Sequence, residues 1–279
     1  MQVQEQIKIW HNAQLNIGGL QAYYTDHAFP RHSHDYYVVS LVRSGLQSFT
    51  HKGAKHYTPP GGTILINPGA AHTGETTDEN GFEMIFLYPT VAHMQHAVFE
   101  LTGHHQTIPY FREVRVDHPW LAMSVSSLSS ALMQGTDPME SESRFIWTLV
   151  QLVEHFADLS RKEKEPGRER KAVRQARRYI EERFAQGINL TQLAEHVSLS
   201  PYYLLRVFSS EVGMPPYAYL ESVRIRQAQR LIEVGRPLAE VAAEVGFSSQ
   251  SHLTHRFKKI IGVTPGQYAG QIRSCSADK

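Results

Sequence analysis

The sequence predicts a two-domain protein, with an all-β N-terminal domain followed by an all-α C-terminal domain. Between residues 20 and 87, short runs of β-branched and aromatic residues alternate with Gly and Pro, which is typical of a β-sandwich or barrel. From Pro119 onwards, apolar residues recur instead at helical spacing. The nearly all-charged segment SRKEKEPGRERK cannot bury a core and reads as a linker. We therefore expect a first domain over residues 1–160, a linker over 161–171 and a second domain over 172–274.

Three runs in the first domain have the composition of buried strands. Residues 36–42 (YYVVSLV), 63–66 (TILI) and 82–88 (FEMIFLY) are rich in side chains that pack well on a pleated surface. Turn-forming Gly, Pro and Asn residues separate them.

Two helices are expected to follow these strands and to provide a dimerisation surface. Their apolar residues step by three or four positions, which places them on one face of a helix. These residues are Leu121, Val125, Leu128 and Leu132 in the first helix, and Phe145, Leu149, Leu152, Phe156 and Leu159 in the second. One side is expected to pack on the barrel, and the other could pair with a second copy of the chain. Alternatively, both sides are buried within one chain.

The second domain contains the same helix-turn-helix pattern twice. In the later copy, a short amphipathic helix ends at Gly246, and Ser248 and Ser249 can cap a second helix from Gln250 to about Ile260. The earlier copy matches at an offset of 48 residues before the turn and 49 after it. The matched pairs include Leu204 and Leu253, Phe208 and Phe257, Gly213 and Gly262, Pro216 and Pro265, and Tyr219 and Tyr268. Because the second helix of this motif enters the major groove of DNA, two recognition helices are predicted.

Residues 171–273 resemble the DNA-binding domain of AraC/XylS-type transcription regulators. The stretch GFSSQSHLTHRFKKIIGVTPGQY is similar to the family signature over its whole length. The resemblance implies seven helices, with a long central helix joining the two helix-turn-helix units and carrying Arg224, Ala228 and Leu231. It also implies a homodimer that binds double-stranded DNA, works with RNA polymerase and acts as an activator.

The resemblance places the side chains that read bases on the exposed face of each recognition helix. Arg206 can form two hydrogen bonds with a guanine edge, and Gln250 suits adenine. Lys258 and Lys259 are expected at phosphates, which fix the position of the protein without reading sequence. The expected DNA contacts are Tyr202, Leu205, Arg206, Gln250, Ser251, Thr254, His255, Arg256, Lys258 and Lys259.

Two histidine-containing segments of the first domain resemble the half-motifs of the cupin barrel. The first is His32-Ser33-His34, and the second runs from Gly62 through Pro68-Gly69 to His72. AraC-type regulators often carry such a barrel as a sensor, so the resemblance implies a cupin-like effector-binding domain. In metal-binding cupins, a Glu joins the three His, but here that position is Val38 or Val39. Because Val cannot coordinate a metal, we expect a pocket without a metal or other cofactor.

The effector pocket is expected to include Arg31, His32, His34, Tyr36 and His72. Alternate residues of a strand share one face, so His32 and His34 can both point into the barrel. Neutral imidazoles can each donate and accept one hydrogen bond, which suits a small polar ligand. Protonation would favour an anionic ligand, with a pH dependence near the usual histidine pKa of about 6.5. The histidines and tyrosines, with Arg31 and Arg43, could suit a small carboxylate or an amino acid, and sugars and aromatic ligands are not excluded.

Composition and charge narrow the class of protein. No apolar run approaches the roughly 20 residues that span a bilayer, and the N-terminus lacks a secretion-signal pattern. The single cysteine, Cys275, excludes an intramolecular disulfide and a cysteine-based metal site. We therefore expect a cytoplasmic protein.

The charge is distributed unevenly along the chain. Residues 1–160 carry 8 basic and 15 acidic residues, whereas residues 161–279 carry 20 basic and 12 acidic residues. The basic half is the one expected to bind DNA.

The sequence favours a transcription regulator without enzymatic activity, controlled by a small molecule in the barrel. Two alternatives are a metal-dependent cupin enzyme fused to a DNA-binding domain, and a constitutive DNA-binding protein whose barrel serves only dimerisation. Because the charged linker separates the domains, we also expect two separate cores, so that changes in the barrel leave basal DNA binding intact.

Overall fold

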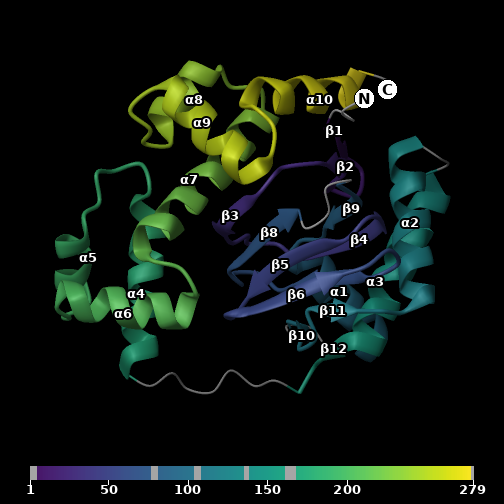
Figure 1. The fold of residues 1–279 in the computed structure, drawn as a ribbon, viewed down its shortest axis with the longest axis horizontal. Coiled ribbons are helices and arrows are strands. Elements are labelled where there is room, and N and C mark those ends of the chain that lie inside the picture. The colour runs from purple at the N-terminus through teal and green to yellow at the C-terminus, as the bar shows by residue number, and fades with distance from the viewer. Residues whose placement is uncertain (1–4, 77–80, 104–107, 135–137, 161–167, 278–279) are drawn as a thin grey trace.

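The computed structural model describes residues 5–76, 81–103, 108–134, 138–160 and 168–277 (Figure 1). Within these residues, three β-sheets and three helices form the N-terminal domain, and the C-terminal domain is helical. The expected linker falls mostly outside these residues, and the first helix after it, α4 (Arg168–Arg183), begins before the expected boundary at residue 172. No helix in the described residues is long and apolar enough to cross a lipid bilayer.

The larger sheet contains the three runs predicted as buried strands. Its order is β1 (Gln6–Asn12), β2 (Ile17–Tyr24), β9 (Phe82–Tyr88), β4 (Val38–Ser44), β7 (Thr63–Ile66) and β11 (Arg115–Val116), with antiparallel neighbours. Side chains alternate across β4: Val38 and Ser40 face an internal cavity, whereas Val39 and Leu41 pack beneath the helices. One face of this sheet therefore lines the cavity, and the other face packs against the helices of the domain.

The smaller sheet brings two of the three motif histidines together. Its order is β3 (Phe29–His32), β8 (His72–Thr76), β5 (Gln47–His51) and β6 (Ala54–Thr58). In the β3–β8 pair, His32 lies directly opposite His72. Two further short strands, β10 (Tyr110–Phe111) and β12 (Ala157–Asp158), pair with each other.

Three helices pack with the outer face of the larger sheet. They are α1 (Val91–Thr102), α2 (Pro119–Gln134) and α3 (Pro138–Phe156). The predicted apolar stripes are buried except at the end of the second, where Phe156 and Leu159 are half-buried. Leu159 follows the end of α3.

The C-terminal domain forms seven helices within residues 168–277. They are α4, α5 (Leu190–His196), α6 (Pro201–Val212), α7 (Pro216–Glu233), α8 (Leu238–Glu244), α9 (Gln250–Ile261) and α10 (Pro265–Ala277). The long helix α7 joins the unit α5–α6 to the unit α8–α9, so that the two units lie at opposite ends of the domain (Figure 1).

The predicted repeat is confirmed by matching ends of the two recognition helices. The Ser200 and Ser249 hydroxyls accept hydrogen bonds from the backbone NH groups of Tyr203 and His252, which caps α6 and α9. Gly213 and Gly262 end these helices at φ angles of 80° and 93°, a conformation that glycine adopts without steric cost. The paired core residues Leu204, Phe208, Leu253 and Phe257 are all fully buried.

The two domains share one hydrophobic core, so the expectation of two separate cores is wrong. Ile225, Ile232 and Ile260 of the C-terminal domain pack in the same cluster as Leu20 and Tyr24 of the barrel. The Gln271 side chain on α10 also accepts a hydrogen bond from Ile9 NH at 2.6 Å and donates one to the Ile7 carbonyl at 3.2 Å. A charged linker shows only that the connecting chain is solvated, and it does not prevent the domains that it connects from docking.

Candidate DNA-binding surface and effector cavity

The side chains expected to contact DNA lie on the second helix of each unit. On α6, Leu205 and Arg206 are exposed, whereas the side chain of Tyr202 is outside the part of the chain that the structure describes. On α9, Thr254 is half-buried and the exposed members of the set are Gln250, Ser251, His255, Lys258 and Lys259. These exposed polar and cationic groups suit contacts to base edges and phosphates.

Arg206 is positioned by an aromatic neighbour on its own helix. Its guanidinium carbon lies 4.9 Å from the centre of the Tyr203 ring, which is a cation–π contact. The Tyr203 hydroxyl donates a hydrogen bond to the Glu169 carboxylate of α4. A side chain that is already restrained loses less conformational freedom when it binds.

Arg256 differs from the other expected DNA contacts. Its side chain is 35% exposed, and its Nε lies 3.2 Å from Oε1 of Glu221 on α7. This ion pair joins the recognition helix to the central helix. The geometry therefore favours a role for Arg256 in positioning α9. The helical spacing of the sequence could not reveal this role, because the partner Glu221 lies on another helix.

A groove runs between the barrel and the recognition helix α9. It is lined by His27, which precedes β3, and by six residues of α9: Gln250, Ser251, Thr254, His255, Lys258 and Lys259. All six belong to the predicted DNA-contacting set. In this arrangement of the domains, the predicted DNA-reading face of the second unit therefore lies beside the barrel.

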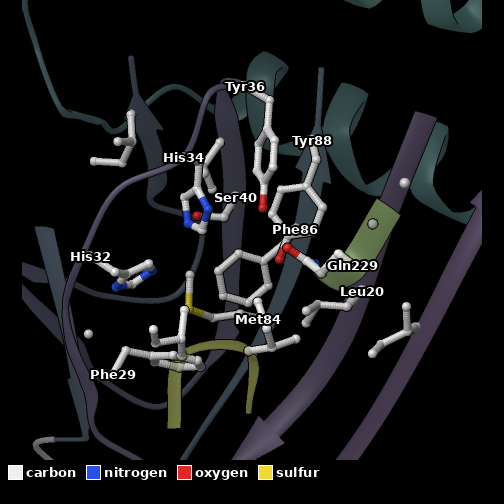
Figure 2. A pocket seen from close by; sticks show the side chains of 18 of the residues that line it. Leu20, Phe29, His32, His34, Tyr36, Ser40, Met84, Phe86, Tyr88 and Gln229 are labelled. Carbon is white, nitrogen blue, oxygen red and sulfur yellow. The ribbon is translucent and has the colours of Figure 1, made fainter. Parts of the chain in front are cut away.

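A cavity of about 520 Å³ lies inside the barrel and is closed by the C-terminal domain. The barrel contributes aromatic and apolar side chains, with a smaller number of polar groups (Figure 2). The C-terminal domain contributes Arg226, Gln229, Arg230, Glu233, Ile260, Ile261, Tyr268 and Ile272. Figure 2 shows Gln229 reaching in from α7 near Phe86. A mostly apolar cavity with a few convergent polar groups is the usual form of a small-molecule site.

His32, His34 and His72 form a cluster at one side of this cavity. Their ring centres are 4.5 to 5.4 Å apart, and one ring nitrogen from each lies within 4.8 Å of the others. The Nδ1 atoms of His32 and His72 lie 2.7 Å and 3.0 Å from the carbonyl oxygens of Pro30 and Ala70. Because a carbonyl only accepts, Nδ1 carries the proton in both rings and Nε2 keeps its lone pair.

Burial keeps the three histidines neutral. Desolvation lowers the pKa of His32 to about 4 and that of His72 to about 3, and it lowers the pKa of His34 well below its usual value. The exposed part of the His34 side chain faces the cavity. The expected pH dependence near 6.5 is therefore wrong for this cluster, because a low-dielectric surrounding disfavours the charged imidazolium.

Two tyrosines extend the polar part of the cavity. The Tyr36 ring stacks on His34 at 4.7 Å, and Tyr88 lies 5.1 Å from Tyr36. Burial raises the pKa of both hydroxyls, so each remains a neutral hydrogen-bond donor. Within the described residues, the buried Tyr24 hydroxyl, which also lines the cavity, has no hydrogen-bond partner. The cavity therefore offers donors to an oxygen-bearing ligand.

The loop between His32 and Tyr36 is bound directly to the central helix. Asp35 accepts a hydrogen bond from Arg230 at 2.6 Å and lies 3.8 Å from Arg226. Arg226 also donates to the Ser33 carbonyl at 3.3 Å. His34, Asp35 and Tyr36 all line the cavity, so this part of the cavity wall is connected to α7, the helix that joins both DNA-binding units.

Arg31 lies outside the cavity, unlike the other four residues expected there. Its guanidinium donates a hydrogen bond to the Gly213 carbonyl, at the end of α6. Because Arg31 precedes His32 on β3, its side chain leaves the strand on the opposite face. The structure places Arg31 at the contact between the barrel and the first helix-turn-helix unit.

Sequence reasoning missed the wall that the C-terminal domain adds to the cavity. Arg226, Gln229, Arg230 and Glu233 recur at helical spacing on one face of α7. Such a polar stripe is also typical of a solvated helix face. The sequence pattern alone therefore does not distinguish a cavity wall from an exposed surface.

The fold and the cavity together define a protein that combines DNA-binding helices with a small-molecule site. Family models match at both ends of the chain: a helix-turn-helix domain over residues 193–271 and an AraC-like ligand-binding domain over residues 14–149. The chain belongs to the AraC-type family of transcriptional regulators, and its activity is controlled by a small-molecule effector.

Similar proteins support this assignment over most of the chain. An uncharacterised HTH-type transcriptional regulator of Bacillus subtilis, YbfI, is 33% identical over 229 residues, which cover 81% of each chain. The arabinose operon regulatory protein of Salmonella typhimurium is 27% identical over 242 residues, covering 83% of each. The fold resembles that of unsaturated fatty acid-bound ToxT from Vibrio cholerae, with a TM-score of 0.59 at 13% identity, covering 96% of this chain and 95% of that one.

Proposed function

We propose that an effector in the cavity controls how the two recognition helices are presented to DNA. The observation that carries this proposal is that the cavity wall includes residues of both domains, among them Ile260 and Ile261 of α9. An effector can shift the arrangement of the domains only by the difference in its affinity for the alternative states. Because Ile260 and Ile261 line the cavity only while the domains are docked, a ligand that fills the barrel and displaces them has such a difference in favour of separated domains.

The groove beside α9 supports one direction of control. While the domains are docked, His27 and the barrel flank the face of α9 that carries Gln250 and Lys258. An effector that favours separation of the two domains frees this face for the major groove. The protein then acts as an activator that contacts RNA polymerase at its promoters, in the cytoplasm and without enzymatic activity.

The effector has an apolar body and a polar end. One part of the cavity is lined by Leu20, Met84 and Phe86, and another by His32, His34 and Tyr36 (Figure 2). Phe29 lies beside His32. The sugar operon and the fatty acid in the names of similar proteins differ in chemistry, so the lining of this cavity is the better guide to the ligand.

The dimer surface that we propose lies on the outer side of α2 and α3. Trp147 and Met123 are 60% and 72% exposed. Trp147 lies one turn after Arg144, and Met123 lies one turn before Ser127, which accepts a hydrogen bond from Arg144. The two apolar side chains therefore flank one polar contact on the same surface, which a second copy can cover. Trp147→Glu is expected to convert a dimer to a monomer in sedimentation, and an unchanged mass would place the dimer contact elsewhere.

The decisive experiment pairs two glutamine variants of α7. DNA sites are first selected with the full chain, and effectors are then found by thermal shift. Gln229→Ala, inside the cavity, should weaken the effector-induced change in DNA affinity by about tenfold, roughly 1.4 kcal/mol. Gln227→Ala, on the same helix but outside the cavity wall, should behave as the native chain. Equal behaviour of both variants would contradict an effector site in this cavity.

A further inference from the structure

The histidine cluster has the arrangement of a metal site. Three imidazoles converge with one nitrogen each within 4.8 Å of the other two, and no acidic side chain belongs to the group. His32 and His72 direct their protonated nitrogens to backbone carbonyls, so their other nitrogens have lone pairs and no proton. Two unprotonated nitrogens that face each other repel unless a hydrogen-bond donor or a metal ion lies between them, and a metal ion can bind all three rings at once. We propose that His32, His34 and His72 bind one divalent transition-metal ion that presents an open coordination position to the effector.

The donor set fits such an ion in several respects. Imidazole nitrogen is a good ligand for zinc, iron, nickel and copper. With Zn–N bonds of about 2.0–2.1 Å, nitrogens in a tetrahedral site lie roughly 3.4 Å apart, which small rotations of these rings can reach. The carbonyls of Pro30 and Ala70 act as the outer partners that commonly fix the tautomer and orientation of metal-bound histidine.

The absent carboxylate leaves a position open without removing the site. The expectation of a metal-free pocket rested on Val38 or Val39 standing where metal-binding cupins have a Glu. Val38 lines the cavity, whereas Val39 packs on the opposite face of the sheet. Three protein ligands with a free fourth position are a recurrent arrangement for zinc. The free position here faces a ligand cavity, so the effector itself can complete the coordination.

A metal here specifies the chemical class of the effector, and this step rests on the function proposed above. A doubly charged ion among three neutral imidazoles is costly to bury without an anion. Asp35, the acidic side chain between His34 and Tyr36, is already paired with Arg230 and Arg226. Glu233, the other acidic side chain that lines the cavity, accepts a hydrogen bond from the Tyr268 hydroxyl. With both carboxylates already engaged, the missing negative charge comes from the ligand. We infer an effector with an apolar body and an anionic oxygen donor, such as a carboxylate, bound at the metal beside the hydroxyls of Tyr36 and Tyr88.

The test uses the full chain without an affinity tag, stripped of metal with a chelator. Cobalt(II) is then titrated, because its visible absorption distinguishes four-coordinate from six-coordinate sites. We expect one four-coordinate cobalt per chain, displaced by zinc. His34→Ala and His72→Gln should each lose more than the roughly 10–100-fold in affinity that removal of an outer partner costs. His96→Ala, on the surface of α1 with a side chain 58% exposed, is the matched control and should bind as the native chain.

The outcomes separate this proposal from the function on which it rests. Addition of a small carboxylate should change the cobalt spectrum of the native chain and not that of a correctly folded His34→Ala variant. No stoichiometric metal in the native chain, or loss of binding in His96→Ala as well, overturns the metal site. DNA binding by the stripped chain is measured in parallel, and its absence would count against the regulator function while the cobalt spectrum still reports on the site.

Discussion

The two helix-turn-helix units have matching sequences but very different contacts with the barrel. The first unit touches the rim of the barrel, where Arg31 bonds the Gly213 carbonyl and Ala71 joins the core of that unit. The second unit is part of the barrel's own core, and Ile260 of its recognition helix lines the cavity. A ligand can therefore act on the second unit by contact, whereas it reaches the first indirectly, through α7 or through the rim contacts of Arg31 and Ala71.

The equivalent tyrosines Tyr219 and Tyr268 show the same contrast in one residue. Tyr219 follows the first unit and bonds Arg177 and Glu181 of α4, all within the C-terminal domain. Tyr268 follows the second unit, donates to Glu233 and lines the cavity. The two copies of the repeat thus have the same tyrosine, but in the second copy this tyrosine also faces the cavity because the second unit is docked on the barrel.

The largest expected effect comes from removing the matched phenylalanines. Phe208→Ala and Phe257→Ala each empty a fully buried position, which costs roughly 3–5 kcal/mol of unfolding free energy. The three tryptophans, Trp10, Trp120 and Trp147, all lie in the N-terminal domain, so their fluorescence follows barrel unfolding. Phe257→Ala should lower the urea midpoint of this signal more than Phe208→Ala. Equal shifts would mean that the two units are coupled to the barrel to the same degree.

Acid should destabilise the barrel of the metal-stripped chain before it affects the first unit. His32 and His72 have folded pKa values of about 4 and about 3, below the value of about 6.5 in an unfolded chain. The unfolded state therefore binds more protons, and the unfolding free energy falls as the pH drops from 6.5 towards 4. The expected loss is on the order of a few kcal/mol. His72→Gln should flatten this dependence in urea titrations at several pH values, whereas His96→Gln should retain it.

A smaller effect should separate the two recognition helices on DNA. Arg206→Ala should reduce discrimination against a mismatched guanine position by roughly 1–3 kcal/mol. Lys258→Ala should weaken matched and scrambled sites equally and reduce the salt slope of binding by about 0.9. Both are measured by titration of labelled duplexes at several salt concentrations. Equal weakening of both sites by Arg206→Ala would remove its assignment to a base.

Features set by local chemistry could be predicted from the sequence. The caps at Ser200 and Ser249 and the helix ends at Gly213 and Gly262 depend on residues a few positions away, so the repeat and its boundaries were predictable. The convergence of His32 with His72 does not depend on local chemistry, since the pairing of β3 with β8 joins residues that are distant in sequence. It could be predicted only from the resemblance to the cupin family.

Docking between the domains could not be predicted in this way. Gln229 and Tyr268 become cavity residues only because the C-terminal domain packs on the barrel, and no local pattern encodes that long-range contact. The same holds for Arg256, whose partner Glu221 lies on another helix. The low pKa of the histidines also depends on burial that composition does not reveal.

Ligand recognition and signal transmission are assigned to adjacent residues of one short loop. His34 and Tyr36 contribute rings to the cavity, while Asp35 between them is bonded to α7. During evolution, substitutions at positions 34 and 36 can change the molecule that is sensed while position 35 preserves the connection. Insertion or deletion of one residue in this loop would instead move the ligand-contacting positions to the α7 side and the α7-bonding position to the cavity. A change of ligand is therefore more readily reached by substitution than by a change in loop length.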